Sequence, residues 1–464
     1  MKPKVSLIRL SKINHNIPGY LNREIAKAEP EFICFIDDKN SRVKLKDYFL
    51  DLMQIAISKN PNVGMVYADY EIIANGKTEE VHLLKHHIGR VRDNQDYGKV
   101  FLFRKSYLEQ IGGFDEDLKH HFLYDIRLKL SEVSEIAHIA NRYNGSLYQV
   151  SASKENTNVF DYLLSDEIIQ KEAENILTNH LKRNGVYLSP NQKYEKRPIT
   201  SIKPLKKASI IIPVNNRPEF IVNAIESAQK QTIQDIEIII VVNGGESDPT
   251  NKSVKRFLKG GDRYSADKPQ VNLITVDINN IGFCLNLGVN NAQGEYYIQL
   301  DSDDRLKPDA VEIIIQKFES DSTIGMVIGS YEVWQKLDSG EIIRDEDVPM
   351  VTHSEWTDNN GRNNVLRING AGAPRAIPIQ LIKDIGFFEM NENPFARNYG
   401  EDYDMVLCIS EKCKIGRIYD PIYEVIRHSG GTDHSIDQAT INRNDEAKDW
   451  MRKEAILRRK AMNK

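Results

Sequence analysis

The sequence has few cysteines and no apolar run long enough to cross a membrane. Only four of its 464 residues are cysteines, and they are too scattered for a disulfide framework. Cys408 and Cys413 also lack the C-x-x-C spacing of a structural zinc site. No stretch approaches 18 apolar residues, which argues against a membrane span, and the first apolar run ends too early for a signal peptide. A reducing, cytoplasmic setting is therefore expected.

An excess of positive charge is also missing. The net charge is -5 and the isoelectric point is near 6.2, whereas nucleic-acid-binding proteins usually present a basic face. We therefore expect no nucleic-acid partner. A content of 40% hydrophobic and 28% charged residues is typical of a globular protein, and the length predicts two to four domains.

An internal repeat organises the chain. Residues 16–22 and 31–37 resemble residues 280–286 and 295–301 at one constant offset. Repeats of this kind indicate related structural units. Two related units are therefore predicted to lie in tandem.

The first copy differs from the second where chemistry is expected. Lys39 stands where the second copy has Asp303, and an ammonium group at this place would repel a cation. The dipeptide Phe-Leu at 122–123 replaces Glu-Asp at 401–402. The first copy also begins at the equivalent of about residue 270, so it lacks the two strand-helix units that open the second. These differences predict a truncated, non-catalytic copy.

Four parts follow from composition and pattern. They are a truncated, non-catalytic copy at 1–150, a helical linker at 151–206, a catalytic domain at 207–435 and a helical tail at 436–464. The linker carries a helical apolar pattern over 166–185. The tail is basic towards its end and could contact anionic lipid; a solvated terminal helix is the favoured alternative.

Apolar runs in the second copy alternate with helical patterns. The predicted strands are 209–214, 236–242, 271–276 and 296–300. Alternation at this spacing predicts an α/β domain with a mostly parallel sheet and helices on both faces.

The strand at 296–300 ends in three carboxylates, Asp301, Asp303 and Asp304. Two carboxylates one residue apart can share one hard cation such as Mg²⁺ or Mn²⁺, and open α/β sheets bind ligands at the carboxyl ends of their strands. The alternative is an acidic turn that caps the next helix, which Pro308 would help to start.

Four ordered motifs resemble glycosyltransferase family 2 with its Rossmann-like GT-A fold. They are IIPVNNRPEF at 211–220, VVNGGES at 241–247, NIGFCLNLG at 280–288 and GEYYIQLDSDD at 294–304. The resemblance covers roughly residues 207–435. The tandem layout is similar to that of bacterial enzymes that build O-antigen, capsule or other surface polysaccharides.

The resemblance implies a site for a nucleotide-sugar donor. The residues that it assigns to this site are Pro213, Val214, Asn216, Asn243, Asn286 and Asp301. Asn243 stands where the family usually has an Asp that contacts the base or ribose, and an amide can still hydrogen-bond there. Leu285 replaces an Arg that often contacts the diphosphate, so one expected contact is missing.

The resemblance also implies a metal site and a base. Asp303 and His428 would hold Mn²⁺ or Mg²⁺, which neutralises the leaving diphosphate. Asp402 would take the proton of the acceptor hydroxyl in an inverting transfer, and Glu401 would position the acceptor or the loop. Without the resemblance, the acidic pair could simply favour a helix N-terminus, and His428 could be an ordinary surface residue.

The implied function is a metal-dependent glycosyltransferase. Its partners would be a nucleotide-sugar donor, most simply UDP-linked, and a glycan or lipid-linked saccharide acceptor, with peripheral contact at the inner membrane. Residues 352–369, which include Trp356, are a candidate acceptor loop because aromatic faces suit sugar rings; an ordinary surface loop is the alternative. Other functions left open are a non-catalytic glycan-binding scaffold subunit and a nucleotidyltransferase. Spacing does not fix the oligomeric state.

Overall fold

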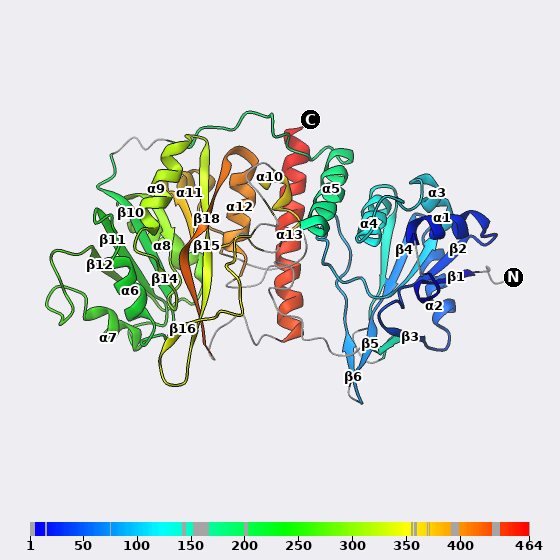
Figure 1. Ribbon diagram of the computed structural model, residues 1–464, viewed down its shortest axis with the longest axis horizontal. Helices are drawn as coiled ribbons and strands as arrows, with labels where there is room; N and C mark the ends of the chain where they lie inside the picture. Colours follow the sequence, from blue (N-terminus) through cyan, green and yellow to red (C-terminus); the bar gives the residue numbers. More distant parts are fainter. Residues whose placement is uncertain are drawn as a thin grey trace. The chain divides into compact units, whose positions relative to one another are not determined.

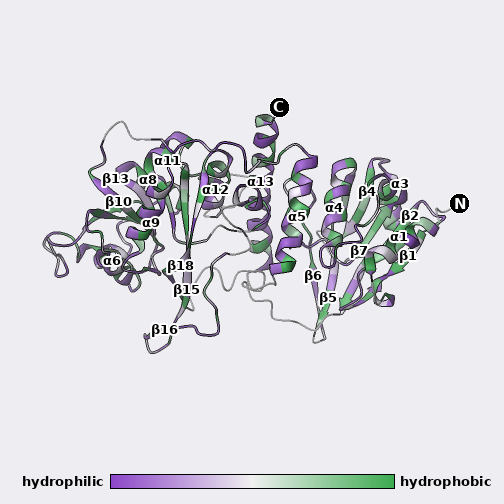
Figure 2. Cartoon of the chain, turned by 45° about the horizontal axis from the view of Figure 1, so that its top comes forward, coloured by the Kyte–Doolittle hydropathy of each residue, from purple (hydrophilic) through white to green (hydrophobic). Residues whose placement is uncertain are grey.

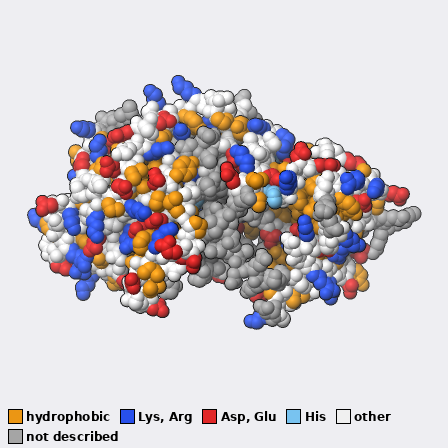
Figure 3. Space-filling model, viewed as in Figure 1, with side chains coloured by type: hydrophobic (Ala, Val, Ile, Leu, Met, Phe, Trp, Pro, Cys, Tyr) orange, Lys and Arg blue, Asp and Glu red, His pale blue; other side chains and the backbone are white. Residues whose placement is uncertain are grey.

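The chain divides into two compact units (Figure 1). In this computed structural model, unit 1 comprises Met1–Tyr187 and Ile456–Lys464, and unit 2 comprises Leu188–Ala455. The structure describes residues 5–13, 16–74, 76–141, 145–151, 167–198, 203–353, 356, 360–368, 370, 372–390, 399–428 and 437–463. Hydrophobic residues concentrate on the central strands of each unit (Figure 2). Acidic and basic side chains are interspersed on the face that Figure 3 shows.

Four parallel strands make up one half of the sheet in unit 2. β10 (Lys206–Val214) pairs with β11 (Ile236–Val242) on one side and with β13 (Gly294–Gln299) on the other, and β12 (Gln270–Thr275) pairs with β11. The inner three strands are largely apolar and buried, as expected where helices cover both faces.

The other half of this sheet is mixed. Its strands are β14 (Arg305–Leu306), β15 (Ile324–Lys336), β16 (Ile342–Arg344), β17 (Arg375–Pro378) and β18 (Lys414–Arg427). The order is β12-β11-β10-β13-β17-β15-β18-β14, with β16 beside β15. β17 is antiparallel to both of its neighbours, whereas β15 and β18 are parallel. The predicted α/β class is confirmed, but the mostly parallel arrangement holds for the first half, because the apolar pattern of a strand does not reveal its direction.

Helices cover both faces of the sheet. The helices of unit 2 are α6 (Ile221–Gln229), α7 (Thr250–Lys255), α8 (Ile281–Asn291), α9 (Ala310–Ser320), α10 (Gly361–Asn364), α11 (Ile379–Ile385), α12 (Glu401–Lys412) and most of α13 (Gln438–Met462). Helix α8 approaches β10 closely, since a Cβ on Gly288 would lie 2.6 Å from Ile211 Cγ2. Ile210 and Ile212 instead join the buried cluster of α6 and α9. Side chains alternate across a strand, so α8 lies on the face opposite to α6 and α9.

Unit 1 contains two smaller sheets. The first has the order β1-β2-β7-β4-β8 and the second β3-β9-β5-β6. The strands are β1 (Val5–Arg9), β2 (Phe32–Ile36), β3 (Arg42–Leu45), β4 (Val63–Ala68), β5 (Tyr70–Ala74), β6 (Lys77–Val81), β7 (Val100–Arg104), β8 (Glu135–Ile139) and β9 (Tyr148–Ser151). The helices are α1 (Ile17–Lys27), α2 (Phe49–Ser58), α3 (Lys105–Gln110), α4 (Phe122–Val133) and α5 (Glu167–Arg183), with a 3-10 turn at Leu10–Lys12.

The first sheet of unit 1 has the same pairing pattern as part of unit 2. Along β1-β2-β7-β4-β8 the pairs are parallel, antiparallel, antiparallel and parallel. The series β10-β13-β17-β15-β18 has the same directions in the same order. By this pairing β1 takes the place of β10, although its position in the sequence repeat corresponds to β12. Within the described residues of unit 1, β11 and β12 have no counterpart.

Two sequence-based interpretations of the C-terminal half are wrong. Trp356 is fully buried, and the Arg417 guanidinium stacks 3.8 Å from the centre of its ring, so Trp356 is not part of an exposed acceptor loop. Of the candidate acceptor loop, residues 354–355, 357–359 and 369 lie outside the described residues. The tail is not a solvated helix, because Arg452 on α13 is fully buried and donates to the carbonyls of Leu366 and Ile368.

The basic end of the tail and the predicted linker also contribute to packing. Arg459 is fully buried, whereas Lys460 is exposed, so only part of the basic end is packed against the protein. Helix α5 follows the predicted helical pattern and belongs to unit 1, where His180 and Arg183 both bind Glu132 of α4. Among the described residues, no helix is both long enough and apolar enough to cross a lipid bilayer.

Candidate active site

The carboxyl ends of the parallel strands meet at a cavity of about 550 Å³ in unit 2. Val214 ends β10, Asn243 follows β11, and Asp301 lies just beyond β13. All three residues line the cavity. This edge of an open α/β sheet is where ligands bind, so the fold places these predicted residues where a donor could reach them.

Asp301 is held by side chains of two different strands. Its Oδ1 atom accepts a hydrogen bond of 3.1 Å from Gln299 Nε2, and its backbone N–H donates to the Tyr423 hydroxyl at 3.0 Å. Burial raises the pKa of Asp301, and the positive charge of Arg375 opposes the shift. Asp301 is therefore fixed in place before any ligand arrives.

Asp303 and His428 come together from positions far apart in the sequence. His428 Nε2 lies 3.0 Å from Asp303 Oδ2, and the imidazole stacks on the Phe220 ring with 4.2 Å between ring centres. Arg217 also forms an ion pair with Asp303, and its Nη1 atom lies 3.1 Å from His428 Nε2. A carboxylate, an imidazole and a guanidinium therefore lie together at the edge of the cavity, where Arg217 and Asp303 line it and His428 does not.

Asp304, the third acid of the turn, has a structural role. Its Oδ1 atom accepts the backbone N–H of Ile426 at 2.8 Å, which ties the turn to β18. Burial, together with the charges of Asp303 and Asp301, raises the pKa of Asp304 well above its ordinary value. The turn leads into β14, and no side chain caps α9, which begins at Ala310. The alternative of a helix-capping acidic turn is therefore wrong.

Glu401 and Asp402 open helix α12 beside Arg375 at the start of β17. Asp402 Oδ2 accepts from Arg375 Nε at 3.0 Å and from Nη2 at 2.6 Å. Burial alone would raise the pKa of Asp402, but Arg375 and then Lys448 outweigh it and hold the pKa below the ordinary range. Burial and the charge of Asp402 raise the pKa of Glu401 to about 8. At neutral pH the pair is therefore one carboxylate and one carboxylic acid.

Sequence reasoning missed the cations that hold these acids. Arg217, Arg375 and Lys448 each lie beside a predicted acid, but no motif spacing links Arg375 or Lys448 to α12. Lys448 comes from α13, where its Nζ atom lies 4.5 Å from the Tyr399 ring centre. Only the fold brings these charges to the site.

Two predicted donor residues do not line the cavity. Asn216 is exposed, has a φ of 49°, and donates its backbone N–H to Asp248 Oδ2 at 2.8 Å; its neighbour Asn215 lines the cavity instead. Asn286 uses both ends of its amide on Phe388, donating to the carbonyl and accepting from the N–H, each at 2.8 Å. The amide of Asn286 therefore binds the protein backbone.

Comparison with known proteins names the family of this region. Residues 209–363 match the family model described as glycosyl transferase family 2. The chain carries a family 2 glycosyltransferase domain. This domain contains the strands and the acidic turn that form most of the cavity, whereas Arg375, α12 and His428 lie beyond the matched residues. The α/β class and the resemblance to this family are both confirmed.

Curated relatives of the family 2 domain include bacterial polysaccharide synthases. An uncharacterized glycosyltransferase of Rickettsia felis is 27% identical over 74% of this chain and 55% of its own length. The chondroitin synthase of Escherichia coli is 30% identical over 48% of this chain and 30% of its own length. The chain therefore spans about half, or less, of the length of these relatives.

The solved structures found by comparison have low overall similarity to this chain. S. aureus TarS 1-349, solved in complex with UDP-GlcNAc, is 16% identical, covers 55% of this chain and 66% of its own, and has a TM-score of 0.39.

Proposed function

We propose that the protein is a metal-dependent, inverting glycosyltransferase that moves a sugar from a nucleotide-diphosphate donor to a growing bacterial surface glycan. The observation that carries this proposal is the convergence of Asp301, Asp303, Glu401 and Arg375 on one cavity at the carboxyl ends of parallel strands. Asp402 is bound to the same Arg375. These groups could hold a diphosphate, a cation and a proton acceptor within one site.

The nucleotide would occupy the end of the cavity formed by β10 and β11. Pro213, Val214 and Asn243 line this end. Asn243 is 6% exposed, and its Oδ1 atom has no hydrogen-bond partner within the described part of the chain. A buried acceptor of this kind is costly unless a donor binds it, and an N–H of a base such as uracil would supply one. This observation supports a nucleotide whose base presents an N–H, as uracil does.

Asp303 and His428 are the residues that would hold a metal ion. Their 3.0 Å separation suits two neighbouring positions of an octahedral ion with bonds of roughly 2.0–2.1 Å. Among the described residues, no three His, Cys, Asp or Glu side chains are grouped as a metal site, so most positions would be left for water and phosphate oxygens. A carboxylate and an imidazole together favour Mn²⁺ over Mg²⁺. When bound, the ion would neutralise charge on the departing diphosphate.

Asp402 is the proposed base. Its lowered pKa keeps it ionised at neutral pH, and Arg375 holds its orientation. In the proposed step, Asp402 takes the proton of the acceptor hydroxyl while the hydroxyl oxygen bonds to the anomeric carbon. The bond from that carbon to the diphosphate oxygen breaks, and the nucleotide diphosphate leaves with the electron pair. A single displacement of this kind inverts the anomeric configuration.

The acceptor and the cellular position are the least constrained parts of the proposal. The synthases of chondroitin and hyaluronan among the relatives support a bacterial polysaccharide as the product. A cytoplasmic position, with peripheral contact at the inner membrane, would give access to nucleotide sugars and to a lipid-linked acceptor.

Donor turnover with and without Mn²⁺ tests the proposal. We expect the wild-type chain to release UDP from a UDP-sugar in the presence of Mn²⁺, and Asp303→Ala to lose at least about 10²-fold in rate because a charge on the leaving group is no longer stabilised. Asp309→Ala is the control, because Asp309 is an exposed acid beside the same turn that makes no capping bond to α9. Full turnover in EDTA would remove the metal from the proposal. No turnover with any nucleotide sugar would favour a glycan-binding scaffold subunit.

A further inference from the structure

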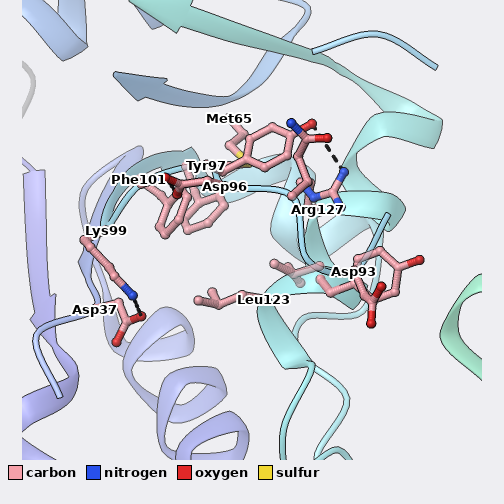
Figure 4. Close-up of a pocket in the computed structure, with 14 residues that line it drawn as sticks. Asp37, Met65, Asp93, Asp96, Tyr97, Lys99, Phe101, Leu123 and Arg127 are labelled. Carbon is pink, nitrogen blue, oxygen red and sulfur yellow. Dashed lines mark hydrogen bonds and ion pairs between the residues drawn. The ribbon is translucent and has the colours of Figure 1, made fainter. Parts of the chain in front are cut away.

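Unit 1 contains a cavity of about 200 Å³ at the place that corresponds to the acidic site of unit 2 (Figure 4). Asp37 follows β2 as Asp301 follows β13. Cys34 pairs with Leu102 as Ile298 pairs with Ala376. The residues before Leu102 and Ala376 are Phe101 and Arg375, and they therefore occupy equivalent places.

Helix α4 gives an independent check of this equivalence. The Tyr124 hydroxyl donates to the carbonyl of Val91 at 2.6 Å, and the Tyr403 hydroxyl donates to the carbonyl of Val365 at 2.6 Å. The residues directly before these tyrosines therefore correspond as well. Leu123, which lines the cavity of unit 1, takes the place of Asp402.

The cavity of unit 1 has lost the groups that the proposed transfer needs. Phe101 and Leu123 replace the Arg375 and Asp402 ion pair, so a guanidinium and a carboxylate become two apolar side chains. Asp37 is paired with Lys99 at 3.3 Å within the unit, as Figure 4 shows. A cavity with these residues can bind a ligand but has no equivalent of the proposed base.

Aromatic rings make up much of the remaining wall. Tyr97, Phe101, Phe103 and Tyr124 line the cavity and are each nearly buried. The acidic residues Asp37, Asp93 and Asp96 line it as well. Apolar rings with a few fixed polar groups are the usual composition of a small-molecule site. Sugar rings match it, because they present C–H groups on a face and hydroxyl donors at the edge.

Arg127 holds the loop between β6 and β7, which carries Asp93, Asp96 and Tyr97. Its guanidinium donates to the carbonyls of Arg90 and Arg92 at 2.6 and 2.7 Å, and it stacks 4.4 Å from the centre of the Tyr97 ring. Asp96 accepts hydrogen bonds from the Tyr70 hydroxyl and the Gly98 N–H. A wall held in this way loses little conformational entropy when a ligand binds.

We infer that this cavity is a binding site for a neutral saccharide unit of a glycan. The size suits a single ring, since about 200 Å³ is smaller than the roughly 300–1,000 Å³ of sites for drug-sized ligands. Three carboxylates against the two cations Lys99 and Arg127 disfavour an anionic sugar or a phosphate. The choice of a glycan as ligand rests on the proposed function, whereas the site itself rests on the geometry of unit 1.

Binding of neutral oligosaccharides to the full chain tests the inference. The probes are tetrasaccharides of glucose and of N-acetylglucosamine, with a uronate-containing tetrasaccharide as the charged comparison, measured by saturation-transfer NMR and calorimetry. We expect at least one neutral probe to bind, and both Leu123→Arg and Leu123→Trp to weaken its affinity about tenfold or more by filling the cavity. Leu52→Arg is the matched control, because Leu52 is an exposed leucine on a helix of the same unit.

Donor turnover measured on the same variants separates this inference from the proposed function. Turnover with no binding of any neutral probe, or with binding that both Leu123 variants retain, would overturn the saccharide site and leave the transferase intact. Preferred binding of the uronate probe would overturn the inference of a neutral ligand. A third outcome is that the chain turns over no donor but binds a saccharide, and that the Leu123 variants lose this binding. This outcome would support the saccharide site and refute the transferase.

Discussion

The corresponding corners of the two units combine the same backbone frame with opposite chemistry. In unit 2, Arg375 and Asp402 form an ion pair beside Glu401 and Asp301. In unit 1 the places of the ion pair are taken by Phe101 and Leu123. Five strands in each unit share their order and pairing directions, so within these strands the difference at the corner lies in a few side chains. The comparison teaches that the edge of the sheet provides a binding site, while the charged residues at this edge decide whether a bound ligand can also react.

The charged corner of unit 2 carries a larger desolvation cost than the apolar corner of unit 1. Buried charges are costly unless each has a partner, and unit 2 supplies those partners from β17 and α13, which lie far from the acids in the sequence. The apolar corner of unit 1 needs no such partners. Loss of one acid would therefore favour loss of its cation, which is consistent with our proposal that unit 1 is a non-catalytic copy.

Replacing the proposed base should give the largest effect. Asp402→Asn keeps the shape of the side chain but cannot accept the hydroxyl proton, so we expect transfer to fall about 10²–10⁴-fold with donor affinity unchanged. Rates and donor binding are measured separately, by UDP release and calorimetry. Asp384→Asn, an exposed change on α11, is the control. Normal transfer by the Asp402 variant would remove the strongest contrast between the two corners.

The free energy of unfolding should fall with rising pH because Glu401 is buried beside Asp402. The pKa of Glu401 is raised from its ordinary 4.5 to about 8, so folding takes up a proton and stability falls as the pH rises between these values. Glu401→Gln removes this dependence. We expect it to gain stability over the wild type, by about 2–4 kcal/mol at pH 8 and above, and by much less near pH 5. Urea unfolding at each pH measures the difference.

The same pH series also examines the choice of base. If Glu401 were the base, the rate of transfer would rise as the pH passes through about 8 and Glu401→Gln would be inactive. With Asp402 as base, no such rise is expected, because its carboxylate is already ionised.

Loss of one asparagine hydrogen-bond pair should reduce stability by a similar, smaller amount in each unit. Asn22 binds the backbone of Phe114 as Asn286 binds that of Phe388, through one bond to the carbonyl and one from the N–H. Replacing either asparagine by alanine leaves a buried N–H and C=O without their partner, and we expect a loss of about 1–3 kcal/mol. Hydrogen exchange of the two phenylalanine amides measures it in each unit.

The exposed Asn291→Ala, at the end of the same α8 helix, is the control for these variants and should change stability little. An unchanged KM for the donor in Asn286→Ala is also expected. A raised KM with normal stability would instead restore Asn286 to the donor site.

The sequence was most informative where one element determines the position of a residue. Apolar runs predicted β10, β11 and β13, and therefore the position of Asp301 at the sheet edge. The approach of His428 to Asp303 came from the family resemblance. Arg375 and Lys448 could not be predicted, because their places depend on how β17 and α13 pack. Trp356 was misread for a related reason, since composition does not show that Arg417 covers its ring.

The hydrogen bonds of Asn22 to Phe114 and of Asn286 to Phe388 restrict the identity of the asparagine but not that of its partner. The hydrogen bonds of each asparagine go to backbone groups of its partner, so they do not depend on which side chain the partner carries. In a library scored for folding, positions 22 and 286 should accept few replacements, while 114 and 388 should accept several apolar ones. Hydrogen bonds from a side chain to a partner's backbone therefore let a duplicated domain change the residues of its ligand site while the fold stays the same.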